Sequence, residues 1–372
     1  MENPRFDFKK ESISPLGFGL MRLPVNSDGS IDEKHVCRMA DSFLESGMNY
    51  FDTAYVYHGG FSERIFKRAV SDRHPRSSYK LATKLPIWQV KKHSDMQEML
   101  EEQLKRTGLD FIDFYLIHSI DAGHNEFCEK YDAFEFIRKI KEQGKARHIG
   151  FSFHGDSALL RKLLSEHPEV EFVQLQLNYY DWDAIKAGEL YNIALEHNTP
   201  VIIMEPVRGG MLSKLPEDAA RILSSADPKA SFASWALRWC SSLDGVMTVL
   251  SGMSNAEQMK DNLATYADFS PISDYERNAI EKVNGILKNR PTIPCTSCKY
   301  CSDCPQSIPI YSIFEKYNHY INTNQNLGMF RGAYQQLKPR GDSCIECGLC
   351  ESLCPQGINI INELKAIERL VQ

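Results

Sequence analysis

Four side chains that can hold or move a proton stand at or just after apolar runs early in the chain. Asp52 closes the run MNYFDTA, Tyr57 follows five residues later, and Lys84 and His118 close the runs YKLATK and DFYLIH. Burying an unpaired carboxylate costs several kcal/mol, so we expect Asp52 to have a cationic partner. An ammonium beside a tyrosine stabilises the phenolate, which makes the tyrosine a stronger acid near neutral pH.

These residue types predict proton donation to a carbonyl. Tyr57 is the expected acid, Lys84 and Asp52 tune it, and His118 orients the substrate oxygen. A turn-capping role for Asp52 or simple packing of Tyr57 would explain one residue, but not all four together. The first 285 residues contain no metal-binding motif and no G-x-S-x-G nucleophile elbow. A general acid without a nucleophile indicates that the other reactant is a hydride, and therefore a nicotinamide cofactor.

Cysteine usage indicates a second kind of site. Eight of the eleven cysteines fall after residue 290, in the runs CTSCKYCSDCP and CIECGLCESLCP. The second run is the C-x₂-C-x₂-C-x₃-C-P pattern of bacterial ferredoxins, and the first run differs from it by one residue. Zinc sites usually gather their ligands as two separated pairs, so the spacing favours two [4Fe–4S] clusters over zinc.

In two-cluster ferredoxins the fourth cysteine of each run ligates the other cluster. That rule gives two expected ligand sets: Cys295, Cys298, Cys301 and Cys354 for one cluster, and Cys344, Cys347, Cys350 and Cys304 for the other. An oxygen-poor cytoplasm, such as that of an anaerobic microbe, would suit these clusters. The isolated residues Cys37, Cys128 and Cys240 are interpreted as small core residues.

Short apolar runs alternate with amphipathic stretches along the first part of the chain, which is typical of a parallel sheet covered by helices. The first run ends in GFGLMRLP and opens no helix, which disfavours a doubly wound sheet with a phosphate loop. Eight such units predict an α/β fold, a closed (β/α)₈ TIM barrel with its functional residues at the C-terminal ends of the strands. The expected strands are Leu16–Leu20, Met48–Phe51, Tyr79–Thr83, Ile112–Ile117, His148–Phe151, Phe172–Gln176, Pro200–Met204 and Val246–Leu250. The expected helices are Asp32–Ser46, Asp95–Thr107, Phe127–Glu142, Ser157–Glu166, Trp182–Glu196, Pro228–Cys240 and Ala256–Leu263.

The chain is expected to form two domains. A helix predicted over Asp274–Lys288 is followed by NRPTIP, whose prolines mark a linker. We therefore expect the barrel over residues 1–288 and a small α-helical, ferredoxin-like dicluster domain over residues 291–372. The second domain is too short to form a large core, so we expect it to be stabilised by a bound metal. One helix is expected between its cysteine runs, over Ile313–Asn322.

The composition excludes several other classes of protein. Apolar residues make up 42% of the 372 residues and charged residues 25%, as in an ordinary globular protein. The net charge of −6 does not indicate nucleic-acid binding, because such binding would need a basic patch. No apolar run approaches the roughly 20 residues of a membrane span. The N-terminal MENPRFDFKKES has no apolar h-region, so a cytoplasmic location is expected.

The motif FDTA-x-x-Y, the strand-ending lysine and the strand-ending histidine resemble the catalytic tetrad of the aldo-keto reductases, here Asp52, Tyr57, Lys84 and His118. This resemblance implies a (β/α)₈ barrel that binds NAD(P)H in an extended form without a Rossmann loop. Four further segments resemble the family's cofactor contacts. HIGFSFHG with Ser152 and FVQLQLNYYD with Gln174 resemble the segments that bind the nicotinamide carboxamide. IIMEPVRGGML, with Met204, Glu205, Pro206 and Arg208, resembles the seventh strand and its pyrophosphate loop, and LSGMSNAEQMKDNL places Gly252, Gln258 and Asn262 by the adenosine.

The sequence departs from the family's pattern at several of these positions. Phe153 follows Ser152 where the family often has asparagine, and Met204 stands where an aromatic residue often stacks on the nicotinamide. Gly252 and Gln258 occupy the places of a lysine and an arginine that often grip the adenosine 2′-phosphate. Without those charge-assisted hydrogen bonds, NADP(H) and NAD(H) both stay open as the cofactor. Arg208 is either a compensating cation at the pyrophosphate or a solvated loop charge.

Two functions of different classes follow from these patterns. The first is an NAD(P)H-dependent oxidoreductase of a small-molecule carbonyl or alcohol that carries two [4Fe–4S] clusters, and this arrangement resembles a bacterial branch of the aldo-keto reductases. The second is an electron-transfer iron–sulfur protein whose barrel serves as a scaffold for a partner or ligand. A nicotinamide delivers two electrons and a cluster accepts one, and no flavin motif bridges them. The clusters are therefore either structural or exchange electrons with a redox partner protein. Cofactor binding discriminates the two functions.

Overall fold

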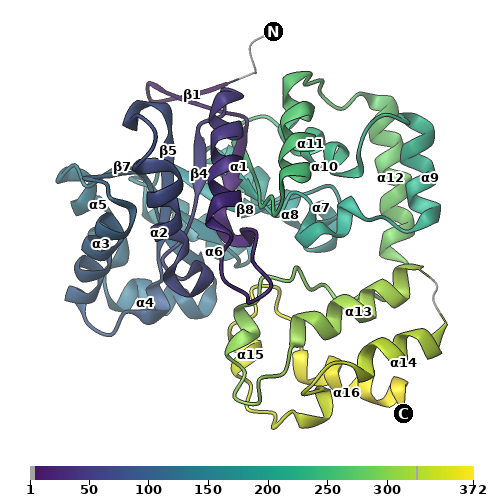
Figure 1. The fold of residues 1–372 in the computed structure, drawn as a ribbon. Coiled ribbons are helices and arrows are strands. Elements are labelled where there is room, and N and C mark those ends of the chain that lie inside the picture. Colours follow the sequence, from purple (N-terminus) through teal and green to yellow (C-terminus); the bar gives the residue numbers. More distant parts are fainter. Residues whose placement is uncertain (1–4, 324–325) are drawn as a thin grey trace. The chain divides into compact units, whose positions relative to one another are not determined.

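The structure is a computed structural model that describes residues 5–323 and 326–372 (Figure 1). Its residues form two compact units. The barrel unit contains the described residues up to Pro206 together with Ala233–Ile272, and the cysteine unit contains Val207–Phe232 and Ser273–Gln372. Within the described ranges, no helix is both long and apolar enough to cross a membrane.

Eight parallel strands close into a barrel in the order β10-β3-β4-β5-β6-β7-β8-β9, which confirms the predicted TIM-barrel class. Almost every strand residue is buried, as expected where a parallel sheet is covered on one face and filled on the other. The strands are β3 (Leu16–Gly19), β4 (Tyr50–Asp52), β5 (Lys80–Leu85), β6 (Ile112–Ile120), β7 (Ala146–Phe153), β8 (Phe172–Gln176), β9 (Val201–Met204) and β10 (Val246–Ser251).

Amphipathic helices alternate with these strands and surround the barrel (Figure 1). The first one illustrates why they form: the Asp32 side chain caps it by accepting from the His35 N–H, and its apolar face includes the buried Met39 and Phe43. The helices are α1 (Glu33–Glu45), α2 (Ser62–Phe66), α3 (His93–Thr107), α4 (Ala122–Lys130), α5 (Ala133–Glu142), α6 (Ser157–Glu166), α7 (Asp181–Ala184), α8 (Ala187–Glu196), α10 (Phe232–Ser241) and α11 (Ala256–Ala267).

Two predicted helices are each two helices in the structure. The stretch Phe127–Glu142 is divided between α4 and α5, because Asp132 takes a left-handed conformation with φ of 53°. The stretch Trp182–Glu196 is divided between α7 and α8 at Lys186, with φ of 57°. Non-glycine residues seldom adopt this conformation, and neither break is marked by glycine or proline. The periodic apolar pattern continues through both breaks, so the sequence does not indicate that the helix ends there.

The strand β6 also differs from its predicted end. Its pairing with β7 shifts register between Ile117 and Ile120, and Ser119 has a left-handed φ of 58°. His118 consequently lies beside a bulge, two residues before the strand ends, rather than immediately after it. Bulges bend a strand and change the direction in which its side chains point, and they are frequent next to active sites.

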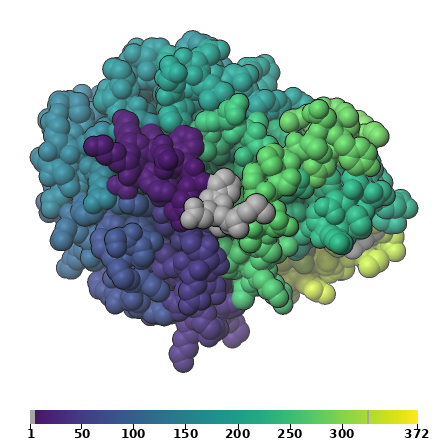
Figure 2. Space-filling model, turned by 90° about the horizontal axis from the view of Figure 1, so that it is seen from above, coloured from purple at the N-terminus to yellow at the C-terminus, as the bar shows by residue number. Residues whose placement is uncertain are grey.

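A hairpin that the sequence analysis did not predict covers the N-terminal end of the barrel. Strands β1 (Phe6–Phe8) and β2 (Glu11–Ile13) pair antiparallel. Phe8 and Ile13 belong to the same buried cluster as Tyr50 and Phe172, which begin their strands. Figure 2 shows the atoms of this N-terminal segment, in purple, on the face seen from above. This end is therefore packed, and chemistry is left to the opposite end.

The cysteine unit is built from helices around its own apolar core. The core includes Ile313, Phe314, Phe330 and Leu364, all nearly inaccessible to solvent. The predicted helices Asp274–Lys288 and Ile313–Asn322 correspond to the whole of α12 and to part of α13, whereas the other helices were not predicted. The elements are η6 (Arg208–Ser213), α9 (Glu217–Ala226), α12 (Asp274–Lys288), η7 (Tyr300–Asp303), α13 (Ile310–Thr323), α14 (Leu327–Gln335), η8 (Gly341–Ser343), α15 (Leu349–Ser352) and α16 (Ile360–Val371).

Candidate active site and cysteine sites

Three tetrad residues meet at the C-terminal ends of β4 and β5. The Lys84 ammonium donates to Asp52 Oδ1 at 2.6 Å and to the carbonyl oxygen of Thr53 at 2.8 Å, and it lies 3.5 Å from the Tyr57 hydroxyl. The register of the barrel explains this arrangement. Asp52 pairs with Ala82, and Lys84 lies two residues further along β5, so both side chains project from the same face.

The ion pair of Asp52 and Lys84 is isolated from solvent. Only 3% of Asp52 and 1% of Lys84 is exposed. Burial raises the pKa of Asp52 and lowers the pKa of Lys84, and the attraction between the two charges opposes both shifts. Removing either partner would leave a buried charge without compensation, which costs about 3–5 kcal/mol in comparable pairs. The lysine is thus fixed beside the tyrosine by a pair that depends on both members.

His118 completes the tetrad from β6. Its ring stands edge-on to the ring of Tyr57, with centroids 5.8 Å apart and an interplanar angle of 78°. Burial holds the pKa of His118 well below its usual value, and repulsion from Lys84, His154 and His124 adds to this shift. The imidazole is therefore neutral at neutral pH, and it can take part in hydrogen bonds to a substrate oxygen without carrying charge.

Two aromatic neighbours of the tetrad were missed by the sequence analysis. The indole of Trp88 lies 5.1 Å from the His118 ring and stacks on the His124 ring at 5.0 Å. Trp88 follows β5 in the segment KLPIWQV, and His124 follows β6. Trp88 lies in a short 3-10 turn after β5, and His124 lies in the first turn of α4, directly after β6. Their position just after the C-terminal ends of strands was the available signal, because the segments that follow these ends build the active sites of such barrels.

The residues expected at the nicotinamide lie on the next three strands. Ser152 on β7 is paired in register with Gln174 on β8, and Gln176 is paired with Met204 on β9. The Ser152 hydroxyl accepts from the Ser119 N–H at 2.7 Å, at the bulge of β6. The Gln174 carbonyl oxygen is buried and has no hydrogen-bond partner. A buried acceptor without a partner fits an amide donor such as a nicotinamide carboxamide.

The residues expected by the adenosine surround the loop after β10. The Asn262 amide donates to the Ser251 hydroxyl at 2.9 Å, and the Gln258 carbonyl oxygen accepts from the Ser254 N–H at 2.7 Å. These bonds shape the loop from within.

One cation near this loop was missed by the sequence analysis. An added Cβ at Gly252 would lie 3.3 Å from the side chain of Arg22, whose guanidinium bonds Glu205 at 2.7 Å. Nothing in the local sequence of Arg22 indicates this approach, because the two residues are far apart in the chain.

The last two expected cofactor residues fall on either side of the division between the units. Pro206 ends the first segment of the barrel unit, and Arg208 begins η6 in the cysteine unit. Arg208 is buried, adopts a left-handed φ of 50°, and places a guanidinium nitrogen 3.5 Å from the Met211 sulfur. The interpretation of Arg208 as a solvated loop charge is therefore wrong in this structure.

The eight clustered cysteines line two cavities. One cavity is lined by Cys295, Cys298, Cys301 and Cys354, and the other by Cys304, Cys344, Cys347 and Cys350. The structure thus brings together the same two sets that the ferredoxin rule assigns, with the fourth cysteine of each run crossing to the other cavity. Across residues 5–323 and 326–372, no three His, Cys, Asp or Glu side chains converge closely enough to hold a single metal ion.

The two cysteine runs also share one backbone pattern. The N–H two residues after the first cysteine of each run lies 3.4 Å from that cysteine's sulfur, in Ser297 and in Glu346. Left-handed φ values recur at matching positions, in Ser297, Lys299 and Ser307 of the first run and in Glu346, Gly348 and Gly357 of the second. The segments CPQSIPI and CPQGINI then lead into α13 and α16. This internal repeat is readable from the sequence, and its use would have predicted α16.

Burial raises the pKa of one cysteine thiol at each cavity. Desolvation and the neighbouring cysteines raise the pKa of Cys301 to about 12 and, together with Glu351, the pKa of Cys350 to about 11. Metal ligation requires thiolates, so loading either cavity must release protons. Assembly of a cluster is consequently expected to become harder as the pH falls.

Gly209 in η6 closely approaches the first cysteine run within the cysteine unit. An added Cβ at Gly209 would lie 2.4 Å from the carbonyl oxygen of Thr296, between Cys295 and Cys298. We expect Gly209→Ala to displace that run and to lower the iron and sulfide content per chain. Gly210→Ala is the matched control, because Gly210 also has a positive φ but its nearest neighbour would be 3.8 Å away. Equal losses in both variants would assign the effect to backbone strain alone.

A closed barrel with a buried Asp–Lys–Tyr–His constellation at the C-terminal ends of its strands defines a class of barrel oxidoreductases. The comparison with known proteins gives the family: the model described as "Aldo/keto reductase family" matches residues 15–285, and the chain belongs to that family. A second model, described as "4Fe-4S dicluster domain", matches residues 294–359. The two matched ranges lie within the two domains expected from the sequence.

Individual relatives are distant but extensive. An uncharacterized oxidoreductase of Bacillus subtilis, YqkF, is 24% identical over 300 residues, which cover 72% of this chain and 92% of that protein. The L-galactose dehydrogenase of Arabidopsis thaliana is 24% identical over 295 residues, covering 74% and 91%. Among solved structures, the holo form of an aldo-keto reductase from Bacillus halodurans aligns with a TM-score of 0.62 at 27% identity, over 76% of this chain and 96% of that one.

Proposed function

We propose that the protein reduces the carbonyl group of a small molecule to an alcohol, or runs the reverse reaction, with Tyr57 as general acid and NAD(P)H as hydride donor. The observation that carries this proposal is the Lys84 ammonium, which joins Asp52 at 2.6 Å to the Tyr57 hydroxyl at 3.5 Å in a solvent-excluded site. This arrangement favours loss of the Tyr57 hydroxyl proton, because the adjacent ammonium stabilises the phenolate that remains.

The tetrad residues have distinct roles in this mechanism. A nicotinamide cofactor held by the residues described below would supply the hydride for the carbonyl carbon. Tyr57 transfers its hydroxyl proton to the carbonyl oxygen, and Lys84 stabilises the phenolate that remains. Asp52 fixes the ammonium and balances its charge. The neutral imidazole of His118 holds the substrate oxygen beside the Tyr57 hydroxyl, so that the proton has a short path.

The chain offers a consistent set of residues to hold the nicotinamide cofactor. Ser152 and Gln174 would bind the carboxamide, and the partnerless Gln174 oxygen fits its amide group. Met204, Glu205, Pro206 and Arg208 would follow the cofactor along the seventh-strand segment, and Gly252, Gln258 and Asn262 would lie by the adenosine. Arg22 stands against Gly252 and is the candidate cation for a 2′-phosphate, which favours testing NADPH before NADH.

Gln174 provides a direct test of this binding site. We expect Gln174→Leu to raise the Kd for the nicotinamide cofactor about 5- to 10-fold, the effect of one lost neutral hydrogen bond of about 1–1.4 kcal/mol. The Kd is measured by quenching of protein fluorescence, with the surface variant Gln143→Leu as a control. An unchanged Kd would remove Gln174 from the proposed site.

We further propose that the two cysteine-lined cavities each hold a [4Fe–4S] cluster and that a redox partner protein exchanges electrons with them. Thiolates are the ligands that such clusters take, and each cavity gathers four cysteines in the crossed arrangement of ferredoxins. The test is an anaerobic titration with NADPH and then NADH, following the visible absorbance of the clusters, with dithionite as the positive control. Bleaching by a nicotinamide would connect the two functions. Cofactor binding without bleaching would separate hydride chemistry from the clusters, and absence of both would favour the electron-transfer scaffold.

A further inference from the structure

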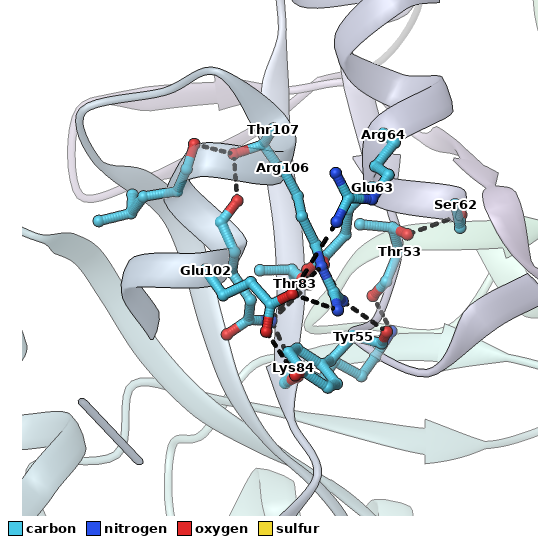
Figure 3. A network of polar contacts seen from close by, with 12 residues as sticks. Thr53, Tyr55, Ser62, Glu63, Arg64, Thr83, Lys84, Glu102, Arg106 and Thr107 are labelled. Atoms are coloured by element: carbon cyan, nitrogen blue, oxygen red, sulfur yellow. Dashed lines mark hydrogen bonds and ion pairs between the residues drawn. The ribbon is translucent and has the colours of Figure 1, made fainter. Parts of the chain in front are cut away.

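A second buried carboxylate lies behind the tetrad, and the mechanism above does not use it. The Glu63 side chain on α2 is fully buried. Its Oε1 accepts from the Thr83 hydroxyl at 2.7 Å and from the Gln103 amide at 2.9 Å, and its Oε2 accepts from the Arg106 guanidinium at 3.2 Å. Figure 3 shows Glu63, Thr83 and Arg106 converging beside Lys84.

The donors that hold Glu63 also hold the backbone that carries the tetrad. The Gln103 amide donates to the carbonyl oxygen of Lys84 at 3.1 Å, and the Arg106 guanidinium donates to the carbonyl oxygen of Tyr55 at 3.1 Å. Tyr55 lies two residues before Tyr57. The Glu63 carboxylate therefore connects the strand that carries Lys84 to the loop that carries Tyr57. Gln103 makes the connection on one side and Arg106 on the other.

The hydrogen bonds on both sides of the Gln103 amide agree on one orientation. Its carbonyl oxygen accepts from the Tyr115 hydroxyl at 2.7 Å, which leaves the amide nitrogen to face Glu63 and Lys84. Tyr115 is fully buried on β6. The reverse orientation would place an amide carbonyl against the Glu63 carboxylate, so the hydrogen bonds assign the orientation.

The tetrad and this network each contain a buried ion pair. Asp52 and Lys84 form one buried pair, and Glu63 and Arg106 form a second. Burial raises the pKa of Glu63, and its bonds to Thr83, Gln103 and Arg106 oppose the shift. The negative charge of Glu63 adds to that of Asp52 in opposing the lowered pKa of Lys84. A single neutralised carboxylate would change the electrostatics of the whole group.

We propose that Glu63 is a positioning residue: through Gln103 and Arg106 it holds the Lys84 strand and the Tyr57 loop at the separation that proton transfer needs. The 3.5 Å between the Lys84 nitrogen and the Tyr57 oxygen is at the outer limit of a hydrogen bond, so a small displacement would break it. The kinetic consequence rests on the proposed function, whereas the effect on Lys84 does not.

The test compares Glu63→Gln with Glu102→Gln. Glutamine keeps the size of Glu63 but removes its charge and turns an N–H toward Arg106 or Gln103. Glu102 is the matched control because it also bonds Arg106, but its side chain is 40% exposed and bonds the Tyr55 hydroxyl instead of Thr83 and Gln103. We expect E63Q to lower kcat roughly 10- to 100-fold for an aldehyde that the wild type reduces, with KM and the NADPH Kd unchanged, and E102Q to leave all three unchanged.

A second readout needs no activity. In protein labelled with ¹³C at lysine Cε, the Lys84 resonance is assigned by its absence in Lys84→Met and is titrated with pH. We expect its midpoint to fall in E63Q and to stay in E102Q, because only the first loses an anion behind the ammonium. The ionisable groups around Lys84 in this comparison are Asp52 on β4, Tyr57 on η2 (Tyr57–Gly60), Glu63 on α2, Arg106 on α3 and His118 on β6.

Each outcome decides the proposal. Equal kcat losses in E63Q and E102Q, or an unmoved Lys84 midpoint in E63Q, would overturn it and leave Glu63 a structural residue. If E63Q does not fold, Thr83→Val replaces it, since valine removes one donor to Glu63 without adding a charge. A kcat loss of a few-fold in T83V supports the proposal, and an unchanged kcat overturns it. If the wild type reduces no carbonyl compound, the proposed function fails, but the Lys84 titration still tests Glu63.

Discussion

Replacing Tyr57 by phenylalanine is expected to lower kcat for carbonyl reduction by about 100- to 10,000-fold, the usual contribution of a positioned general acid. Phenylalanine keeps the ring that stands edge-on to His118 and removes only the hydroxyl beside the Lys84 ammonium. The Kd for NADPH should stay unchanged, because that binding is assigned to other residues. The measurement is a steady-state assay of nicotinamide oxidation on an aldehyde that the wild type reduces.

Tyr55→Phe is the matched control for this experiment. Tyr55 lies in the same loop, but its hydroxyl donates to Glu102 at 2.7 Å and not to the tetrad. We expect its loss to cost only the stability of one partly exposed hydrogen bond and to leave kcat within about twofold. A kcat within threefold of the wild type in Tyr57→Phe, or similar losses in both variants, would show that the proton comes from another group.

The barrel and the tetrad could be predicted because each has a local signature. The strands are short apolar runs with β-forming residues, and Asp52, Lys84 and His118 stand out as polar residues that close such runs. In a parallel barrel all strands present their C-terminal ends on one side, so three strand ends predict one shared site. The structure brings Asp52 and Tyr57 within contact distance of the Lys84 ammonium.

The features that were not predicted depend on contacts between distant segments or on rare backbone conformations. Glu63 lies in a short helix, where a glutamate normally faces solvent. It is buried because Arg106, 43 residues later, reaches it from another helix. Arg22 approaches Gly252 across an even longer separation. Ser119, beside His118 in β6, has a left-handed φ. This conformation could not be predicted from the sequence, because serine seldom adopts it.

The second large effect is expected at the cysteines. Cys298→Ser and Cys347→Ser change equivalent positions in the two runs, the second cysteine in each. We expect each variant to lose one cluster, so that iron falls from about eight to about four atoms per chain and the visible absorbance falls by about half. Cys37→Ser is the control, since this cysteine lies outside both runs. Iron and sulfide are measured in protein that is produced and purified anaerobically.

Double variants test the crossed arrangement of ligands. In the structure Cys298 shares a cavity with Cys354, whereas Cys304, from the same run as Cys298, lines the other cavity. The variant C298S/C354S should therefore retain as much iron as C298S alone, because both changes damage one cluster. The variant C298S/C304S should lose nearly all of its iron, because each change damages a different cluster.

An uncrossed arrangement gives the opposite result for the same two proteins. If each run ligated its own cluster, C298S/C304S would retain one cluster and C298S/C354S would lose both. Serine is close to cysteine in size, so differences between the double variants report ligation more than packing. The core of the cysteine unit, which includes Ile313, Phe314 and Leu364, is untouched in all of them. Full iron content in every single variant would contradict cluster ligation by these cysteines altogether, and the cavities would then need another explanation.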